Sequence, residues 1–254
     1  MNSYKITEVT AETIAEAGMC CNKDKKSPGY KAKVEWFKLK INEGLKIRLL
    51  LDEGGKQIGF IEYLPGELAW RPVNAAGYYF IHCIAILVKE SRNKNLASLL
   101  IQECEADAKL NKKSGICVMS SDGVWMANKT IFEKNGFTIA GKLGRFELMV
   151  KKFNDKNPEP HLIDWTKNLQ KYQGWNLVYS DQCPWHEKSV TDLKDAAKSQ
   201  GIELNIIKLK TPEEAQQAPS GFGTFSLIYN GKLLEDHYLS KTRFETILKQ
   251  QKPE

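Results

Sequence analysis

The pattern of apolar and polar positions divides the chain into two series of elements. In the first series, strands are indicated by alternating or wholly apolar runs, and helices by apolar positions three and four residues apart. Asp52-Glu53-Gly54-Gly55 predicts a hairpin turn, and Gly44 predicts a helix end. The expected order is strand, helix, helix, three strands, helix, strand, helix and two strands, over 4–9, 11–21, 30–42, 45–51, 57–64, 78–88, 96–110, 115–120, 125–134, 137–141 and 145–150.

The second series follows a charged segment that contains two prolines. Residues 151–161, KKFNDKNPEPH, have the composition of a linker between domains, and 162–172 predict a connecting helix. The expected order is then strand, helix, strand, helix, two strands and helix, over 175–179, 187–200, 203–209, 212–217, 224–229, 233–238 and 241–250. We therefore expect an α/β (α+β) protein with domains at 1–153 and 174–254, joined by a linker and helix at 154–173.

Composition narrows the class of protein. Apolar residues make up 42% of the chain and charged residues 27%, which is typical of a globular protein in water. No apolar run reaches membrane-spanning length, the N-terminal residues show no leader pattern, and no Cys/His spacing resembles a zinc site. Six cysteines scattered through predicted core elements favour reduced thiols and a cytoplasmic location. We expect no membrane, metal or nucleic-acid partner, and we leave a homodimer open.

The stretch from 78 to 110 carries the strongest indication of chemistry. An apolar strand leads into a basic turn at 89–95, and the turn opens a helix over 96–110. The first N–H groups of a helix have no partner within the helix, and the helix dipole favours negative charge beside them. A basic turn at that position predicts an anion site, so we expect a ligand that carries phosphate. The net charge of +6 suits such a ligand, although a solvated lysine-rich surface is the preferred explanation for it.

Two motifs give this part of the chain a family resemblance. Arg92-Asn93-Lys94-Asn95-Leu96-Ala97 fits a turn of Arg or Gln, two residues, Gly, one residue, then Gly or Ala. Phe132-Glu133-Lys134-Asn135-Gly136-Phe137 fits the end of a late helix, an aromatic residue followed by Gly-Phe after three positions. Over roughly 1–153 the chain resembles the GNAT acetyltransferase superfamily. The resemblance implies the GNAT acyl-CoA N-acyltransferase fold and acetyl-CoA as co-substrate.

The resemblance also implies roles for individual residues. Backbone N–H groups of the turn would bind the pyrophosphate of coenzyme A, and the strand end would pair with the pantetheine arm. The implied contacts are Ile84, Ile86, Leu87, Arg92, Asn93, Lys94, Asn95, Leu96, Ala97, Asn128 and Phe132. Two positions depart from the family pattern. Asn95 replaces the usual Gly, and Phe132 replaces a Tyr that many members use to protonate the departing thiolate.

The remaining candidates in the first domain have two interpretations each. His82, on the strand beside the expected thioester, is either a base or proton shuttle, or a buried core histidine. Glu62 is either a base acting through water or a solvated strand residue. Strand alternation predicts that Cys83 faces away from His82 and belongs to the core. Trp125, near the late helix, is either a contact to pantetheine or substrate, or simple packing.

The second domain has one reactive candidate. Its order of elements, with Cys183-Pro184-Trp185-His186 before the first helix, resembles the thioredoxin/glutaredoxin fold, but His186 replaces the resolving cysteine. In one interpretation, the helix N-terminus and a protonated His186 lower the pKa of the Cys183 thiol, which then binds a thiol-reactive substrate, a mixed disulfide or a soft metal ion. In the other, the domain is a degenerate fold that serves substrate recognition or dimerisation.

The two domains together resemble a narrower family, GNAT proteins with a C-terminal YoaP-like domain. The residues that support this are Trp125-Met126-Ala127, Ser180-Asp181-Gln182-Cys183-Pro184, Gly223-Thr224-Phe225 and Asp236-His237-Tyr238. The function implied is acetyl transfer to the amine of a small molecule or peptide by direct attack, with the second domain helping to choose the acceptor. The alternatives are a non-catalytic acyl-CoA sensor, a thiol- or metal-binding module using Cys183, and a Cys183 thiolate that accepts the acetyl group or holds the substrate.

Overall fold

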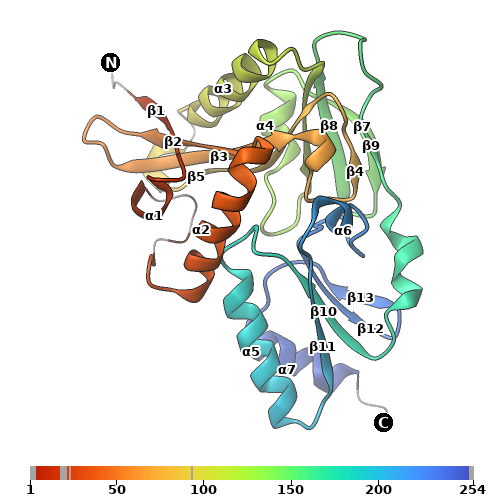
Figure 1. The fold of residues 1–254 in the computed structure, drawn as a ribbon. Helices are drawn as coiled ribbons and strands as arrows, with labels where there is room; N and C mark the ends of the chain where they lie inside the picture. Colours follow the sequence, from red (N-terminus) through yellow and green to blue (C-terminus); the bar gives the residue numbers. More distant parts are fainter. Residues whose placement is uncertain (1–3, 18–21, 23, 93, 252–254) are drawn as a thin grey trace. The chain divides into compact units, whose positions relative to one another are not determined.

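The computed structural model describes residues 4–17, 22, 24–92 and 94–251 (Figure 1). Contacts between Cα atoms divide the described chain into two compact units. The first unit takes its residues from 1–25, 34–69 and 73–163, and the second from 26–33, 70–72 and 164–254. Each unit contains its own sheet.

The first unit is built on a seven-stranded mixed sheet. All neighbouring strands run antiparallel except β5 and β6, which are parallel and are joined through α3 (Leu96–Leu110). The order across the sheet is β1 (Lys5–Glu8), β2 (Lys46–Leu51), β3 (Gln57–Pro65), β5 (Tyr79–Ile86), β6 (Gly115–Ser120), β8 (Phe146–Lys152) and β7 (Thr138–Leu143). A separate pair consists of β4 (Val73–Asn74) and β9 (His161–Leu162).

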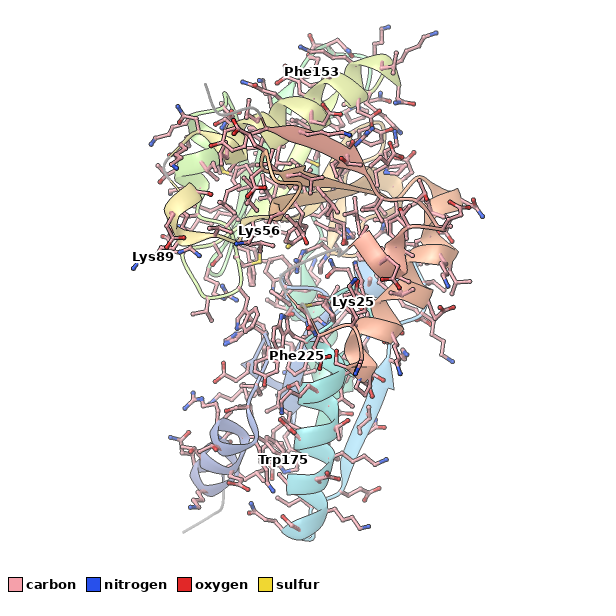
Figure 2. All side chains as sticks on the ribbon, turned by 90° about the vertical axis from the view of Figure 1, so that its left-hand side faces the viewer. Lys25, Lys56, Lys89, Phe153, Trp175 and Phe225 are labelled. Atoms are coloured by element: carbon pink, nitrogen blue, oxygen red, sulfur yellow. The ribbon has the colours of Figure 1, made fainter. Side chains whose placement is uncertain are left out.

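The core of this unit lies where α3 packs on β3, β5 and β6. Leu100, Ile101 and Cys104 are fully buried there because the helix presents one apolar face to the sheet. The other helical segments are α1 (Ile14–Ala17), α4 (Lys129–Glu133) and the short 3-10 segments Ile41–Glu43, Gly66–Leu68 and Lys89–Ser91. Figure 2 shows Lys89, which belongs to the last of these, projecting outward from the ribbon. Helix α2 (Pro28–Lys40) contributes 34–40 to this unit and 28–33 to the second.

A buried polar cluster fixes α3 to the sheet. Asp107 of α3 accepts hydrogen bonds from Lys46 Nζ at 2.7 Å and from the Tyr63 hydroxyl at 3.0 Å. Asn111 donates to the same carboxylate at 3.1 Å. Burial raises the pKa of Tyr63 well above its usual value, so the hydroxyl keeps the proton that it donates. The C-terminal part of α3 is thereby held at a defined place on the sheet.

The second unit has a four-stranded sheet. Its order is β11 (Leu204–Lys208), β10 (Trp175–Tyr179), β12 (Phe225–Tyr229) and β13 (Lys232–Glu235), with only the β10–β11 pair parallel. Helices α5 (His186–Ser199) and α7 (Lys241–Gln250) pack against each other. Phe225, labelled in Figure 2, is fully buried. The remaining segments are α6 (Pro212–Gln216) and a 3-10 segment over Trp165–Lys171.

The mixed α/β class and the predicted order of the main strands and helices are confirmed, but several helix boundaries differ. The helix expected over 125–134 begins only at Lys129. Asn128 has an extended backbone and its side chain accepts from Thr130 N, so it acts as the N-cap. The helix α2 starts two residues before the expected Tyr30, because Pro28 fits the first helical turn. Of the helix expected over 11–21, Ile14–Ala17 is helical, and 18–21 lie outside the described residues.

The predicted linker contains more structure than its composition indicates. Its first two residues continue β8 to Lys152, and His161 with Leu162 forms β9. The connecting helix expected over 162–172 is the 3-10 segment Trp165–Lys171, whose N-cap Asp164 accepts from Thr166 N. The domain boundaries, the cytoplasmic location and the homodimer stay predictions.

The described part of the chain contains neither a candidate membrane span nor a candidate metal cluster. No helix there combines the length and apolar character needed to cross a membrane. Nor do three or more His, Cys, Asp or Glu side chains gather there in an arrangement that could hold a metal ion.

Candidate functional site

Strands β5 and β6 are paired over only part of their length. The paired residues are Tyr79–Ile81 and 116–118, so β5 continues to Ile86 without β6 beside it. On its other edge β5 stays bonded to β3, and Leu87 N donates to Ile58 O at 2.8 Å. Because N–H groups alternate in direction along a strand, those of Ile84 and Ile86 face the edge that β6 has left. An extended ligand can pair with that open edge.

The turn before α3 ends in a left-handed residue. Asn95 has φ 58° and ψ 15°, and its side chain makes no capping hydrogen bond. Apart from Gly, Asn is one of the few residues that adopt this conformation at low cost, so it can replace the Gly of the family pattern. With no side-chain cap, the first N–H groups of α3 remain available for an anion.

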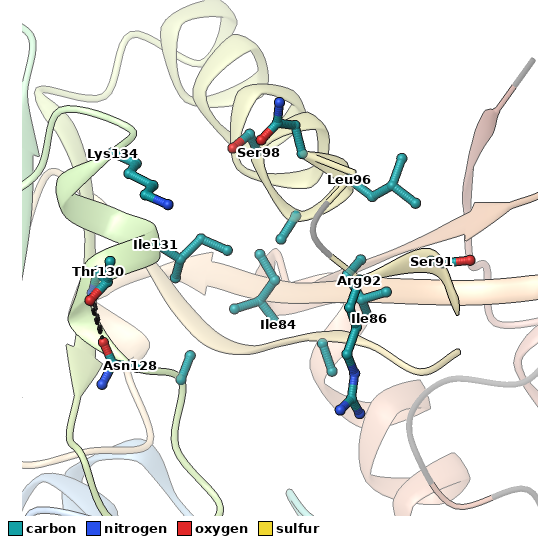
Figure 3. Close-up of a pocket in the computed structure, with 14 residues that line it drawn as sticks. Ile84, Ile86, Ser91, Arg92, Leu96, Ser98, Asn128, Thr130, Ile131 and Lys134 are labelled. Atoms are coloured by element: carbon teal, nitrogen blue, oxygen red, sulfur yellow. Dashed lines mark hydrogen bonds between the residues drawn. The ribbon is translucent and has the colours of Figure 1, made fainter. Parts of the chain in front are cut away.

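A pocket of about 510 Å³ lies between this turn, β5 and α4. We call it the α3 pocket. Two cationic side chains line it, Arg92 and Lys134, and no Asp or Glu is among its described lining residues. Figure 3 shows Lys134 reaching from the end of α4 toward α3, and Arg92 running past Ile86. The lining residues are Ile84, Ala85, Ile86, Ser91, Arg92, Asn95, Leu96, Ala97, Ser98, Ala127, Asn128, Thr130, Ile131 and Lys134.

Seven of the eleven cofactor contacts implied by the resemblance come together in this pocket. They are Ile84, Ile86, Arg92, Asn95, Leu96, Ala97 and Asn128. Lys94 does not line it, and the Leu87 N–H is already engaged by β3. Asn93 lies outside the described residues.

The structure places Phe132 in the core. Its side chain is fully buried, and its ring centroid lies 5.5 Å from that of Phe137 in an edge-to-face arrangement. It lines neither the α3 pocket nor the cavity described below. The implied contact between Phe132 and the cofactor is therefore not supported by this geometry, because a fully buried ring presents no surface to a ligand.

Sequence reasoning missed the contribution of α4. Thr130, Ile131 and Lys134 line the α3 pocket, and Ser98 completes the first turn of α3. The available signal was spacing, because Thr130 and Lys134 lie four residues apart and four-residue spacing places side chains on one face of a helix.

An irregularity in β5 changes which side chains share a face. Glu62 is paired with Cys83 and Tyr63 with Ile81, so His82 is an extra residue opposite β3, a β-bulge. Before the bulge Ile81 belongs to the core under α3, and after it Ile84 packs on that same core. The alternation has shifted by one residue. The prediction that Cys83 faces away from His82 was wrong, because both line one cavity.

This second cavity, the β5 cavity, has a volume of about 310 Å³. It shares three lining residues, Ile84, Ala85 and Ala127, with the α3 pocket. The two therefore meet along the part of β5 that β6 has left. The lining residues are Phe60, His82, Cys83, Ile84, Ala85, Val118, Met119, Trp125, Met126 and Ala127.

The structure brings together the two acid–base candidates of the first unit. His82 Nδ1 lies 3.6 Å from Glu62 Oε1, and both side chains are almost completely buried, at 1% and 2% exposure. The distance is that of an ion pair and is too long for a direct hydrogen bond. The interpretation of Glu62 as a solvated strand residue is wrong. A buried carboxylate beside an imidazole stabilises the imidazolium that forms when the ring accepts a proton.

The environment of His186 changes the interpretation of Cys183. The His186 ring is fully buried, and its Nδ1 lies 3.0 Å from Ser180 O. Burial lowers the pKa of His186 to about 4, with Arg71 and Lys33 acting in the same direction. The imidazole is therefore neutral at pH 7, and the expected protonated His186 is wrong. Cys183, which is partly exposed, receives no charge from this histidine.

Two matches relate this chain to known proteins. Residues 203–246 match the model of the YoaP-like family. YoaP of Bacillus subtilis (strain 168), an N-acetyltransferase described as uncharacterized, is 30% identical over 247 residues, which are 95% of this chain and 97% of YoaP.

Among solved structures the similarities are distant. PaiA N-acetyltransferase of Thermoplasma acidophilum, solved with coenzyme A, is 16% identical with a TM-score of 0.43, over 59% of this chain and 99% of PaiA. A GNAT family acetyltransferase of Brucella melitensis, solved with acetyl-CoA, is 14% identical with a TM-score of 0.41, over 63% and 95%. The relationship to YoaP spans nearly the whole of both chains, and on this basis the protein belongs to the family of the N-acetyltransferase YoaP.

Proposed function

We propose that the protein transfers the acetyl group of acetyl-CoA to an amine by direct attack in a ternary complex. The observation that carries this proposal is the α3 pocket, which joins an uncapped helix N-terminus, two cationic side chains and an open strand edge, with no carboxylate among its described lining residues. These groups suit the three parts of coenzyme A, namely pyrophosphate, phosphorylated ribose and the extended pantetheine arm.

Each group in the pocket has a proposed role. The N–H groups that follow Asn95 bind the pyrophosphate, and Arg92 adds a charge-assisted hydrogen bond to it. Lys134, across the pocket, supplies a further positive charge to the phosphates. The edge of β5 at Ile84 and Ile86 pairs with the amides of the pantetheine arm, which places the thioester where the α3 pocket meets the β5 cavity.

The proposed proton acceptor is His82. An amine attacks only after it has lost its proton, so the incoming ammonium transfers that proton to neutral His82. The Glu62 carboxylate, 3.6 Å from Nδ1, stabilises the resulting imidazolium. The proton acceptor and the thioester are then held side by side, which supplies much of the rate. The amine nitrogen bonds to the acetyl carbon as the C–S bond breaks. Coenzyme A leaves as a thiolate, a good leaving group that needs no acid from position 132, and the second proton lost by the nitrogen neutralises it.

For the second unit we propose a thioredoxin-like domain that helps to recognise the acceptor. The order strand, helix, strand, helix, strand, strand, helix supports this proposal, as does the sheet order β11-β10-β12-β13. A neutral His186 favours recognition over thiol chemistry, because the thiol of Cys183 then has no cationic imidazole to activate it.

Calorimetric titration with acetyl-CoA tests the cofactor site. We expect saturable binding, and we expect Arg92→Ala to weaken it by roughly 10-fold or more, the value of one lost hydrogen bond between charged groups. Arg243→Ala is the matched control, because Arg243 pairs with Glu235 in the second unit and lies outside the α3 pocket. No binding at millimolar acetyl-CoA would refute the proposal.

Release of the coenzyme A thiol over a broad set of amines tests the catalytic part. Turnover with any amine supports transfer, and His82→Gln should lower kcat by about 10²-fold or more if the imidazole accepts the proton. Binding of acetyl-CoA with no turnover of any amine would favour the non-catalytic acyl-CoA sensor.

A further inference from the structure

We infer that the acceptor is a small primary amine that carries one positive charge on a compact apolar body, bound in the β5 cavity. The inference rests on the proposed acetyl transfer and adds the chemical class of the acceptor. It excludes polyamines and aminosugars as preferred substrates. Three observations support it: the composition of the cavity wall, the exposed apolar rim, and the distribution of charge around the cavity.

The wall of the β5 cavity is apolar apart from one end. Phe60, Val118 and Met119 come from the sheet, and Met126 comes from the loop before α4. Flexible thioethers and a phenyl ring adapt to an apolar body and offer it no specific hydrogen bond. His82, with Cys83 next to it, gives the cavity a polar end close to the residues shared with the α3 pocket. An acceptor thus places its nitrogen at His82 and its apolar part along the remaining wall.

The rim continues this apolar surface into solvent. Trp125 lines the cavity and is 46% exposed, and its sequence neighbour Val124 is 60% exposed. Trp125 also has φ 67°, an uncommon and costly conformation for an aromatic residue. Hydrogen bonds hold the loop at both ends, from Arg145 to Ser121 Oγ at 2.7 Å and from Asn128 to Asp122 at 2.6 Å. The loop therefore presents an indole at the entrance in a preformed position.

The charge distribution argues against acceptors with several cations. Among its described lining residues the cavity has no Asp, Glu, Lys or Arg, and Glu62 approaches it only from behind His82. One ammonium can be received at that end, where it loses its proton. A second or third ammonium would lie against Phe60 and the methionines, and burying an unpaired charge there carries a large desolvation penalty.

The volume of the β5 cavity limits the size of the apolar part of the acceptor. At about 310 Å³ it lies near the lower limit of small-molecule pockets, roughly 300–1,000 Å³. That volume suits one ring or a short branched chain and is small for a multi-ring aminosugar. The acceptor class is therefore exemplified by phenethylamine.

The experiment compares three amines on the full-length protein: phenethylamine, spermidine and glucosamine. We expect kcat/KM for phenethylamine to exceed that of either other amine by at least about tenfold, the effect of one well-placed apolar group. Equal or better turnover of spermidine or glucosamine would overturn the inference.

Two variants, Trp125→Ala and Met126→Glu, test whether the acceptor binds in the β5 cavity. Trp125→Ala should raise KM for phenethylamine about tenfold with kcat within about twofold, because an aromatic contact made equally in ground and transition states affects binding alone. Ile139→Ala, which removes a similarly exposed apolar side chain from β7, is the control and should change neither constant. Met126→Glu adds a carboxylate to the wall and should improve the kcat/KM of spermidine relative to phenethylamine. If Trp125→Ala behaves like Ile139→Ala, the cavity does not hold the acceptor body.

A binding measurement separates this inference from the proposed function. Titration of phenethylamine into the protein saturated with coenzyme A should give saturable binding that Trp125→Ala weakens about tenfold, whether or not turnover occurs. Absence of this binding overturns the inference even if acetyl-CoA binds. Absence of acetyl-CoA binding, measured separately, is instead the failure of the proposed function.

Discussion

Position 132 shows how a residue that fits a motif can occupy a different environment from the one the motif implies. The ring of Phe132 packs edge-to-face on Phe137 inside the core, fully covered. The sequence records only that an aromatic residue stands at the expected spacing. Whether its para position meets a ligand or the core depends on how α4 packs against the sheet, which spacing along the chain does not determine.

We predict that Phe132→Tyr lowers stability without restoring a catalytic acid. The added hydroxyl would enter the core, and burying an unpaired hydroxyl costs about 1–3 kcal/mol. Urea unfolding should show this loss, and thiol-release kinetics should show no increase in kcat. A tenfold rise in kcat with unchanged stability would mean that the ring reaches the thioester after all.

The direction of the Cys83 side chain could not be predicted from the sequence. Alternation along a strand places neighbouring side chains on opposite faces, which holds as long as every residue is paired in register. The bulge at His82 breaks this condition, and nothing in the local residues His82-Cys83-Ile84 announces it. The identities of His82 and Glu62 were nevertheless sufficient to name them as acid–base candidates, because their residue types and strands were read correctly.

At the scale of elements, the unit of β5, the basic turn and α3 was predicted best. The bounds of α3 and β6 agree with the expected ranges, because a long apolar periodicity and a run of buried residues leave little ambiguity. Short elements were predicted less well. The helix α4 has only five residues, and its start is set by one capping side chain at Asn128. The pairing of β4 with β9 joins residues far apart in sequence, which no local pattern predicts.

The buried ring of His186, at the start of α5, predicts how the stability of the protein depends on pH. His186 has a pKa of about 4 in the folded protein and an ordinary value of 6.5 when unfolded. The unfolded chain therefore binds more protons between these values, and stability falls as the pH drops from 6.5 to 4. The full shift corresponds to roughly 3 kcal/mol. Above pH 6.5 both states hold a neutral imidazole, so this histidine contributes no pH dependence there.

Urea unfolding at pH 7, 6, 5 and 4 measures this dependence. Because other groups also titrate in the range, the informative quantity is the difference between wild type and His186→Asn. An asparagine amide can still donate to Ser180 O but does not titrate, so we expect the variant to lose less stability on acidification. Parallel curves for the two proteins would show that His186 is not buried as a neutral ring.

At the scale of the whole molecule, the sequence predicted the mixed α/β class, and it placed reactive candidates in both parts of the chain, His82 and Glu62 in the first and Cys183 in the second. Membership of the YoaP family spans both parts, since the similarity to YoaP covers 95% of this chain. The sequence did not show which cysteine side chains are buried, because spacing along the chain does not determine how far a side chain lies from solvent. The structure resolves this for four of the six cysteines, while Cys20 and Cys21 lie outside the described residues.

We predict that alkylation of the native full-length protein at pH 7.5 separates these four thiols. Cys104 and Cys117 are fully buried, and burial raises the pKa of both thiols, so they should react only after unfolding. Cys83 and Cys183 are partly exposed and should react first. Peptide mass spectrometry after timed treatment with iodoacetamide measures each site, and full reaction in urea is the control. Modification of Cys104 as fast as Cys183 would contradict the described core.

The bulge in β5 has a consequence for how related sequences should be compared and engineered. Because one extra residue decides which side chains meet the cavity, the length of this strand matters more than the identity of its neighbours. Deleting His82 would restore regular alternation but bring no other imidazole to the wall, whereas inserting one residue after Cys83 would turn Ile84 and Ile86 away from the core. In an alignment, a gap placed one position off would equate His82 with a residue on the wrong face of the sheet. Grafting this strand onto a relative should therefore transfer the whole segment from Ile81 to Ile86 together with its β3 partner.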